Sequence, residues 1–394
     1  MMNAKARDFS LTAVAVLMLG GLLQLAQQHL DSYSVQVLNL VAINAILAIS
    51  LNLIYGFTGM FSLGHAGFMA IGAYVCTLCI LTPDQKESMW ILETIHPMLA
   101  DLSLPFFFAV LAGGLIAALF GLLIALPVLR LGGDYLGIAT LGFAEIIRVV
   151  ITNATPLTNG SLGIKGIPQY ATLWWNYGWL LITLYCIVSL LKSNVGNVLR
   201  AIRDDEIAAR TMGVDTFFYR VLSFCIGAFF AGVGGALMAA LISTIDPKMF
   251  NFLLTFNVLM IVVAGGLGSV TGSIVGSIVI TVMLEWLRFV ENPISLDSIL
   301  YWLPFSEHYA GRFADVDFDG VPGMRMVIFS VLLMCIILFR RTGLLGMREF
   351  SWAGALDFAR GLPEKGAAFF RSPKKIICYL VLPVYLLWRY VSMP

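Results

Sequence analysis

The stretch Arg200-Ala-Ile-Arg-Asp-Asp-Glu-Ile-Ala-Ala-Arg-Thr-Met-Gly213 lies between two long apolar runs, 173–191 and 221–243. It concentrates charge in a chain of 394 residues, of which 59% are hydrophobic and only 12% are charged. Soluble domains are about 45–50% apolar and about 25% charged. This composition, with a mean hydropathy of +0.90, therefore indicates a protein that crosses a membrane many times. A charged segment between two spans indicates a loop that meets a soluble partner.

The apolar runs predict the transmembrane segments, because a spanning helix needs about 20 apolar residues. We expect an all-α polytopic membrane protein with 10 or 11 spans. The first run follows Lys5 and Arg7 without a clear signal-peptidase site, which indicates an uncleaved span. The run 252–266 is short, as a half-helix or re-entrant segment would be. The expected spans are 9–27, 35–55, 64–81, 105–126, 134–152, 173–191, 221–243, 252–266, 270–290, 324–339 and 376–392.

The distribution of Lys and Arg predicts the orientation, since cytoplasmic loops carry the excess of basic residues. With the N-terminus in the cytoplasm, inner segments hold sixteen basic residues and outer segments hold four. This orientation makes 192–220 a cytoplasmic loop and 291–323 a periplasmic loop. We expect a permease-like membrane domain over 1–347 and a C-terminal extension, 348–394, with an extra membrane helix.

Small residues recur every four positions in three runs, and such ladders let membrane helices approach closely. Two further stretches, Gly56–Gly72 and Gly265–Gly276, are rich in glycine and occupy loosely corresponding places in the two halves. Interrupted segments at matching positions are typical of inverted repeats around a central pathway. An internal inverted repeat is therefore an open hypothesis. The ladders are Gly113, Ala117, Gly121 and Ala125; Ala228, Gly232, Ala236 and Ala240; and Ala264, Gly268, Gly272 and Gly276.

Residues 197–213 have the apolar spacing of one amphipathic helix. Glu206 precedes Arg210 by four residues, the favourable order for an ion pair, and Gly213 suits the residue after a helix. Two interpretations stay open: a solvated interfacial helix, and a coupling helix that docks into a cytoplasmic ATPase. In the second, the coupling residues are Arg200, Arg203, Asp204, Asp205, Glu206, Arg210 and Gly213.

Several segments carry a resemblance to a known family. Leu199–Val214, followed by Tyr219–Phe224, resembles the cytoplasmic loop of LivM-type permeases, which belong to ABC importers of branched-chain amino acids. The resemblance covers about residues 35–347. Further motifs similar to those of the family are Ser50–Phe68, Arg130–Arg148, Thr158–Pro168, Gly265–Gly272 and Phe339–Gly346.

The resemblance implies a set of partners in the inner membrane of a bacterium: a second, LivH-like permease, two cytoplasmic ATPases and a periplasmic binding protein. The sequence has no G-x-x-x-x-G-K-[ST] motif, so ATP and Mg²⁺ are expected in the partner ATPases and no cofactor in this chain. A net charge of +1 gives no reason to expect nucleic acid. The chain departs from the family in its C-terminal extension and in the longer, acidic loop 291–323.

Polar residues within the apolar runs are candidates for the translocation path, because polar groups that face lipid are costly. His65 has no second His or Cys at ligand spacing, so no metal site is expected; a packed, hydrogen-bonded histidine is the alternative. The candidates for the path are Asn52, Thr58, Ser62, His65, Thr140 and Asn257.

Other functions stay open. An ABC permease for urea or short amides has a similar design, and an ion-coupled secondary transporter would use a buried carboxylate, for which Asp134, Glu145 and Glu285 are candidates. Glu145 also has Arg148 three residues on, which fits a local ion pair or a gate. Asp315–Gly320 opens like a calcium loop, but Met326 stands where the bidentate Glu is needed. No catalytic motif supports a membrane enzyme.

Overall fold

The structure is a computed structural model. It describes residues 4–90, 95–130, 135–288, 294–295, 317–318, 323–339, 343–346 and 349. The chain divides into two compact units: residues 1–21 with 349–394, and residues 22–348. The acidic loop 291–323 lies almost wholly outside the described residues, as do Asp134, most of the calcium-like motif and the extension 348–394 apart from Glu349.

Helix α1 (Ala4–His29) begins in the first unit and ends in the second. Its residues Ser10–His29 are long and apolar enough to cross a membrane. The expected first span, 9–27, is therefore confirmed as a helix.

Three helices of the larger unit pack closely through small residues: α3 (His65–Ile80), α6 (Phe106–Val128) and α12 (Thr216–Ile242). A Cβ atom on Gly72 of α3 would lie 2.0 Å from the carbonyl oxygen of Gly232 in α12. A Cβ on Gly113 of α6 would lie 2.7 Å from the carbonyl oxygen of Gly72. The ladders in α6 and α12 therefore mark real helix contacts, while Leu115, Leu119 and Leu123 are exposed on the outer face of α6. The third ladder does not lie on one helix, because a turn at 266–269 separates the helix of Ala264 from the helix of Gly272 and Gly276.

Helix α2 (Ser32–Asn52) is the other centre of packing, and it contacts α9 (Leu173–Lys192), α12, α13 (Phe252–Gly265) and α14 (Val270–Leu287). Helix α7 (Tyr135–Asn153) packs against α3, and α16 (Met324–Phe339) against α13 and α14. At its end α2 widens into a π-helix, Leu53–Phe57. Such a turn is rare and often found at functional sites.

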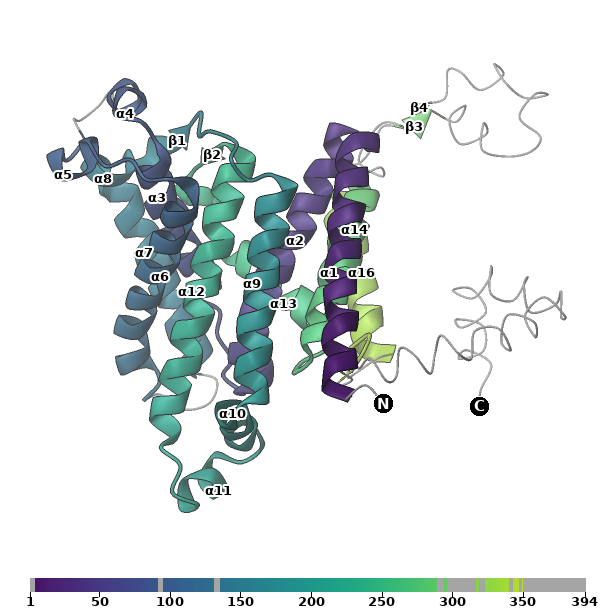
Figure 1. Cartoon of the computed structure of the whole chain (residues 1–394). Coiled ribbons are helices and arrows are strands. Elements are labelled where there is room, and N and C mark those ends of the chain that lie inside the picture. Colours follow the sequence, from purple (N-terminus) through teal and green to yellow (C-terminus); the bar gives the residue numbers. More distant parts are fainter. Residues whose placement is uncertain are drawn as a thin grey trace, which may run out of the picture. The chain divides into compact units, whose positions relative to one another are not determined.

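Short elements lie at the two ends of the larger unit (Figure 1). One end carries α4 (Pro83–Met89), α5 (Pro97–Ala100), α8 (Thr155–Thr158), the 3₁₀ turns Gly160–Leu162 and Pro247–Met249, and the strands β1 (Ile164–Lys165) and β2 (Thr244–Ile245). These strands pair antiparallel, with Ile164 opposite Ile245. The opposite end carries α10 (Asn194–Asp204) and α11 (Glu206–Thr211). Strands β3 (Ile294–Ser295) and β4 (Asp317–Phe318) form a second antiparallel pair.

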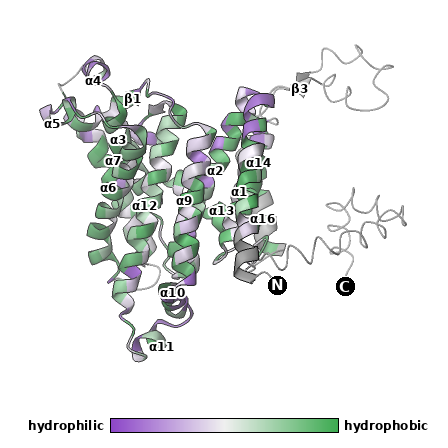
Figure 2. Cartoon of the chain, in the orientation of Figure 1, coloured by the Kyte–Doolittle hydropathy of each residue, from purple (hydrophilic) through white to green (hydrophobic). Residues whose placement is uncertain are grey.

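Apolar residues dominate the long helices, and the polar residues gather toward the short elements and the α10–α11 end (Figure 2). This is the pattern of an all-α polytopic membrane protein. Ten of the eleven expected spans coincide with helices, and the eleventh, 376–392, lies outside the described residues. By length and hydropathy, eight described helices could cross a membrane, or nine if α3 and α4, bent by 119°, form one span. The number is below ten because α3 and α16 have only 16 residues each.

Candidate functional site

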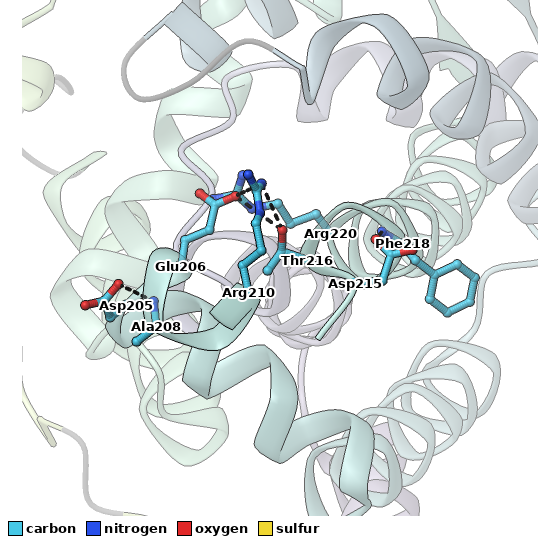
Figure 3. Close-up of polar contacts among 8 residues, drawn as sticks. All are labelled: Asp205, Glu206, Ala208, Arg210, Asp215, Thr216, Phe218 and Arg220. Carbon is cyan, nitrogen blue, oxygen red and sulfur yellow. Dashed lines mark hydrogen bonds and ion pairs between the residues drawn. The ribbon is translucent and has the colours of Figure 1, made fainter. Parts of the chain in front are cut away.

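The charged loop does not form the single helix expected over 197–213; it breaks at Asp205, and that expectation was wrong. Asp205 takes an extended conformation, with φ −157° and ψ 108°, and its carboxylate accepts a hydrogen bond of 3.0 Å from the amide of Ala208 (Figure 3). Asp is a weak residue inside helices but a good N-cap. It therefore ends α10 and starts α11, whereas apolar spacing continues across the break.

Helix α11 ends as the sequence predicts. Gly213 has φ +84° and follows the C-cap Met212. The amide of Gly213 bonds to the carbonyl of Arg210 at 3.0 Å, and that of Val214 to the carbonyl of Ala209 at 3.2 Å. These two bonds form a Schellman motif, which needs a left-handed residue that glycine supplies without strain.

Glu206 joins α11 to the start of α12, as Figure 3 shows. Its carboxylate lies 3.3 Å from Arg210, which confirms the expected i,i+4 ion pair, and it also forms an ion pair with Arg220 of α12. The hydroxyl of Thr216 donates to Glu206 at 3.4 Å. Asp215 caps α12 by accepting from the amide of Phe218 at 3.1 Å. The loop is thus a folded unit fixed to the span that follows it.

The tip of this loop exposes two large apolar side chains beside charged ones. Ile207 is 77% exposed and Met212 is 83% exposed. Asp204, Asp205 and Arg210 are also exposed. Lipid covers exposed apolar groups on spans, but these belong to a hydrophilic loop beyond the end of a span.

The other face of α10 turns toward the long helices. Leu199 and Ile202 are buried there. The guanidinium of Arg203 donates from Nη1 to the carbonyl oxygen of Gly56, in the π-helix, at 3.2 Å. The guanidinium of Arg200 lies over the ring of Phe57, 5.9 Å from its centroid. The seven residues predicted for coupling therefore divide: Arg200 and Arg203 reach inward, Glu206 holds the loop together, and the remainder are exposed.

Asn52, at the end of α2, is fully buried and ties α2 to α14. Its amide nitrogen donates to the carbonyl of Ser269 at 2.8 Å and to the hydroxyl of Ser273 at 2.7 Å. Its amide oxygen accepts from the backbone amide of Gly268 at 2.9 Å. A Cβ on Gly56 would lie 2.4 Å from the nitrogen of Gly268. The two glycine-rich stretches identified in the sequence are therefore in direct contact.

Two more candidates for the path are buried and hydrogen-bonded. The hydroxyl of Thr58 lies 2.7 Å from that of Ser223 in α12 and donates to the carbonyl of Leu53 at 2.9 Å. His65, at the start of α3, has its Nε2 2.8 Å from the hydroxyl of Ser50. Within the described part of the chain, its Nδ1 has no hydrogen-bond partner.

The other three candidates are Thr140, Ser62 and Asn257, and no described hydrogen bond joins them to Asn52 or Gly268. Thr140 in α7 donates to the carbonyl of Gly137 and accepts from the amide of Leu63, both at 3.0 Å. Ser62 is buried one residue before Leu63, and Asn257 is half-buried in α13. That these polar residues line a path stays a prediction. Among the described residues, no three His, Cys, Asp or Glu side chains gather as metal ligands would.

The partners of these residues could not be predicted from the sequence. Ser223, Ser269 and Ser273 lie 165, 217 and 221 residues along the chain from the groups that they contact, and Arg220 lies 14 residues from Glu206. Local spacing carries no signal for such pairs. The only available signal was the presence of Ser and Arg within or beside apolar runs, where polar groups need partners.

Together, the apolar helices in close contact and the folded hydrophilic loop define a multi-pass membrane protein with a structured loop at one end. Residues 33–306, more than half of the chain, match the family described as the permease component of branched-chain amino acid transport systems. The chain belongs to this family.

Curated relatives agree with this membership. The chain is 32% identical over 289 residues to the high-affinity branched-chain amino acid transport permease LivM of Salmonella typhimurium, a match that covers 65% of this chain and 64% of the relative. It is 24% identical over 329 residues to a probable LivM of Methanocaldococcus jannaschii, covering 76% and 89%. It is 25% identical over 248 residues to LivH of Salmonella typhimurium, covering 58% and 76%. No solved structure matches this chain significantly.

Proposed function

We propose that this chain is the membrane-spanning permease subunit of an ATP-driven importer of branched-chain amino acids. Family membership supports the transport class and the substrate class. The proposed coupling to ATP is supported by the loop tip. There Ile207 and Met212 are exposed on a folded, capped element beyond the end of a span. Large exposed apolar side chains rimmed by charge are typical of a protein–protein contact.

The expected assembly contains a second permease, two ATPases and a substrate-binding protein. Similarity to both LivM and LivH relatives supports a pair of related permeases. The ATPases would dock on α10–α11, in the cytoplasm. The binding protein would deliver Leu, Ile or Val at the opposite end, where β1, β2, α4 and α5 lie. Under this proposal the chain would lie in the inner membrane of a bacterium, its N-terminus would face the cytoplasm, and ATP with Mg²⁺ would bind to the partner ATPases.

Coupling then requires that α10–α11 move as one unit with the ATPases. The ion pair of Glu206 with Arg220 fixes α11 to α12, and the pair of Glu206 with Arg210 stabilises α11 itself. The caps at Asp205 and Asp215 stiffen the two helix starts. A displacement of the loop would therefore reach the spans instead of being lost in a flexible connection.

The first test is gentle affinity purification of the chain from its native membranes, with mass spectrometry of the proteins that accompany it. We expect a second permease and P-loop ATPases. Replacing Ile207 and Met212 by Asp should remove the ATPases and keep the second permease, because the loop tip lies beyond the spans. Asn197→Asp, an exposed change at the start of α10 that adds one negative charge where the double variant adds two, is the control and should retain both.

Recovery of the chain without any ATPase would count against the proposal, as would ATPases that remain bound to the double variant. Uptake assays with Leu, Ile, Val and urea then identify the substrate. Uptake of urea or a short amide alone would replace the branched-chain assignment with the amide permease.

A secondary transporter needs a carboxylate that an ion can occupy in the membrane. Of the three sequence candidates, Asp134 lies outside the described residues. Glu145 pairs with Arg148 at 2.6 Å and is 40% exposed, and Glu285 pairs with Arg288 at 3.1 Å and is 22% exposed. Both pairs are local i,i+3 contacts that stabilise a helix. Neither pair favours ion coupling over the ATP-driven importer.

A further inference from the structure

The side chain of Arg203 connects the α10–α11 loop to two interrupted segments of the larger unit. One is α2 with the π-helix that follows it, and the other is the pair α13 and α14 with the turn between them. Its guanidinium is shared: Nε and Nη2 donate to the carboxylate of Asp204 at 3.0 and 2.8 Å, and Nη1 donates to the carbonyl of Gly56 at 3.2 Å. Only 22% of the Arg203 side chain is exposed, whereas Asp204 is 68% exposed. Asp204 thus orients the guanidinium from the solvent side while Arg203 reaches inward.

Glycine at two positions makes room for this side chain. Gly59 has φ +76°, and a Cβ there would lie 3.1 Å from Cγ of Arg203. Gly268 has φ +75°, and its Cβ would lie 3.0 Å from Nη1. A positive φ strains residues other than glycine. At both positions Arg203 also leaves little room for a larger side chain. The two glycine-rich stretches therefore meet at one arginine.

Beyond Gly56 the contact continues into the bundle. Gly56 packs against Gly268, and Asn52 binds Gly268, Ser269 and Ser273 through three hydrogen bonds. These residues join the π-helix after α2 to the turn between α13 and α14. Buried polar networks of this kind are rigid when every member is satisfied. A displacement of Gly56 would therefore displace both interrupted segments together.

We infer that Arg203 is the positioning residue that transmits movement of the α10–α11 loop to the two interrupted segments. The inference rests on the proposed function and gives Arg203 a role that differs from docking: it acts on the membrane segments and not on the ATPase. Arg200 assists by its contact with the Phe57 ring. A planar guanidinium can serve Asp204 and Gly56 together, whereas the single ammonium group of Lys cannot hold both in that geometry.

The experiment uses the purified importer with its partners in lipid nanodiscs and proteoliposomes. The variants are Arg203→Gln, Arg203→Lys and Gly59→Ala, and the control is Lys192→Gln, an equal loss of charge at an exposed site outside the contact. The first readout is hydrogen exchange of the backbone amides in residues 53–60. The second is the number of substrate molecules imported per ATP hydrolysed.

We expect Arg203→Gln to raise the exchange rate in 53–60 by about tenfold, since a hydrogen bond to a charged donor is lost. Uptake per ATP should fall by about tenfold while ATP hydrolysis stays within about twofold of wild type, because the docking surface is intact. Arg203→Lys should be intermediate, and Lys192→Gln should match wild type. If Arg203→Gln does not assemble, Gly59→Ala tests the same contact, since its Cβ pushes Arg203 away.

Unchanged exchange in 53–60 for Arg203→Gln would overturn the inference, as would raised exchange with normal uptake per ATP. A parallel loss of hydrolysis and uptake would make Arg203 a docking residue and also overturn it. Each of these outcomes is measured relative to a wild-type complex that imports substrate with ATP. Failure of the proposed function appears separately, as a wild-type complex that imports nothing on ATP.

Discussion

Glu206 connects α11 to the start of α12, so its replacement should destabilise the loop. Glu206→Gln removes the negative charge that pairs with Arg210 and Arg220. Because both ion pairs are partly exposed, we expect the free energy of unfolding of the loop to fall by about 1 kcal/mol. Trypsin should then cleave after Arg210 several times faster than in wild type, as measured by limited proteolysis of the purified protein.

Glu87→Gln is the control for this change, since Glu87 is exposed in α4 at the other end of the larger unit. Equal cleavage rates after Arg210 in Glu206→Gln and wild type would mean that the ion pairs do not hold α11 on α12.

At the same scale, the sequence predicted contacts between near neighbours and missed those between distant ones. The ion pair of Glu206 with Arg210 and the left-handed Gly213 follow from spacing, because both lie within one helical turn or at its end. The bond from Asn52 to Ser273 joins residues far apart in sequence, and only the fold brings them together.

The long helices pack against one another through glycine residues. The close approach of α3, α6 and α12 at Gly72 leaves no room for a side chain. We expect Gly72→Ala to lower the melting temperature and the yield of folded protein, since overpacking a close contact costs about 1–3 kcal/mol. Thermal unfolding in detergent measures the first effect.

Gly142→Ala is the matched control, because a Cβ on Gly142 of α7 meets nothing within 4 Å. It should leave the melting temperature unchanged or raise it, as Ala favours helices more than Gly does. A Gly72→Ala protein as stable as Gly142→Ala would show that the three helices are farther apart than described.

The position of a helix was predicted well where the composition of a long segment determines it. It was predicted poorly where a single capping residue determines it. The apolar runs predicted the positions of the long helices closely, because burial in lipid requires long apolar segments. They did not predict the short helices α4, α5 and α8. The break at Asp205 was missed, although Asp before Glu206 and Ala208 is a possible helix start. Apolar periodicity describes the face that a helix buries and is insensitive to one capping residue.

In the proposed orientation of the whole molecule, the α10–α11 end faces the cytoplasm. A cysteine at Met212, 83% exposed on the loop, should react with a membrane-impermeant maleimide only when the reagent is on the cytoplasmic side. A cysteine at Leu162, 49% exposed near β1, should react only from the other side. Inside-out and right-side-out vesicles provide the two arrangements.

Reaction of both cysteines from one side would contradict the alternation of the spans. Reaction of Met212→Cys only from the outside would reverse the orientation and move the proposed ATPase contact to the wrong compartment.

Uptake by proteoliposomes that contain the purified complex of this chain and its partners tests ATP-driven import directly. We predict that leucine is imported only with ATP and Mg²⁺ on the side of the α10–α11 loop and with the binding protein on the opposite side. Leucine uptake by this chain alone, driven by a Na⁺ or H⁺ gradient without ATP, would contradict this prediction.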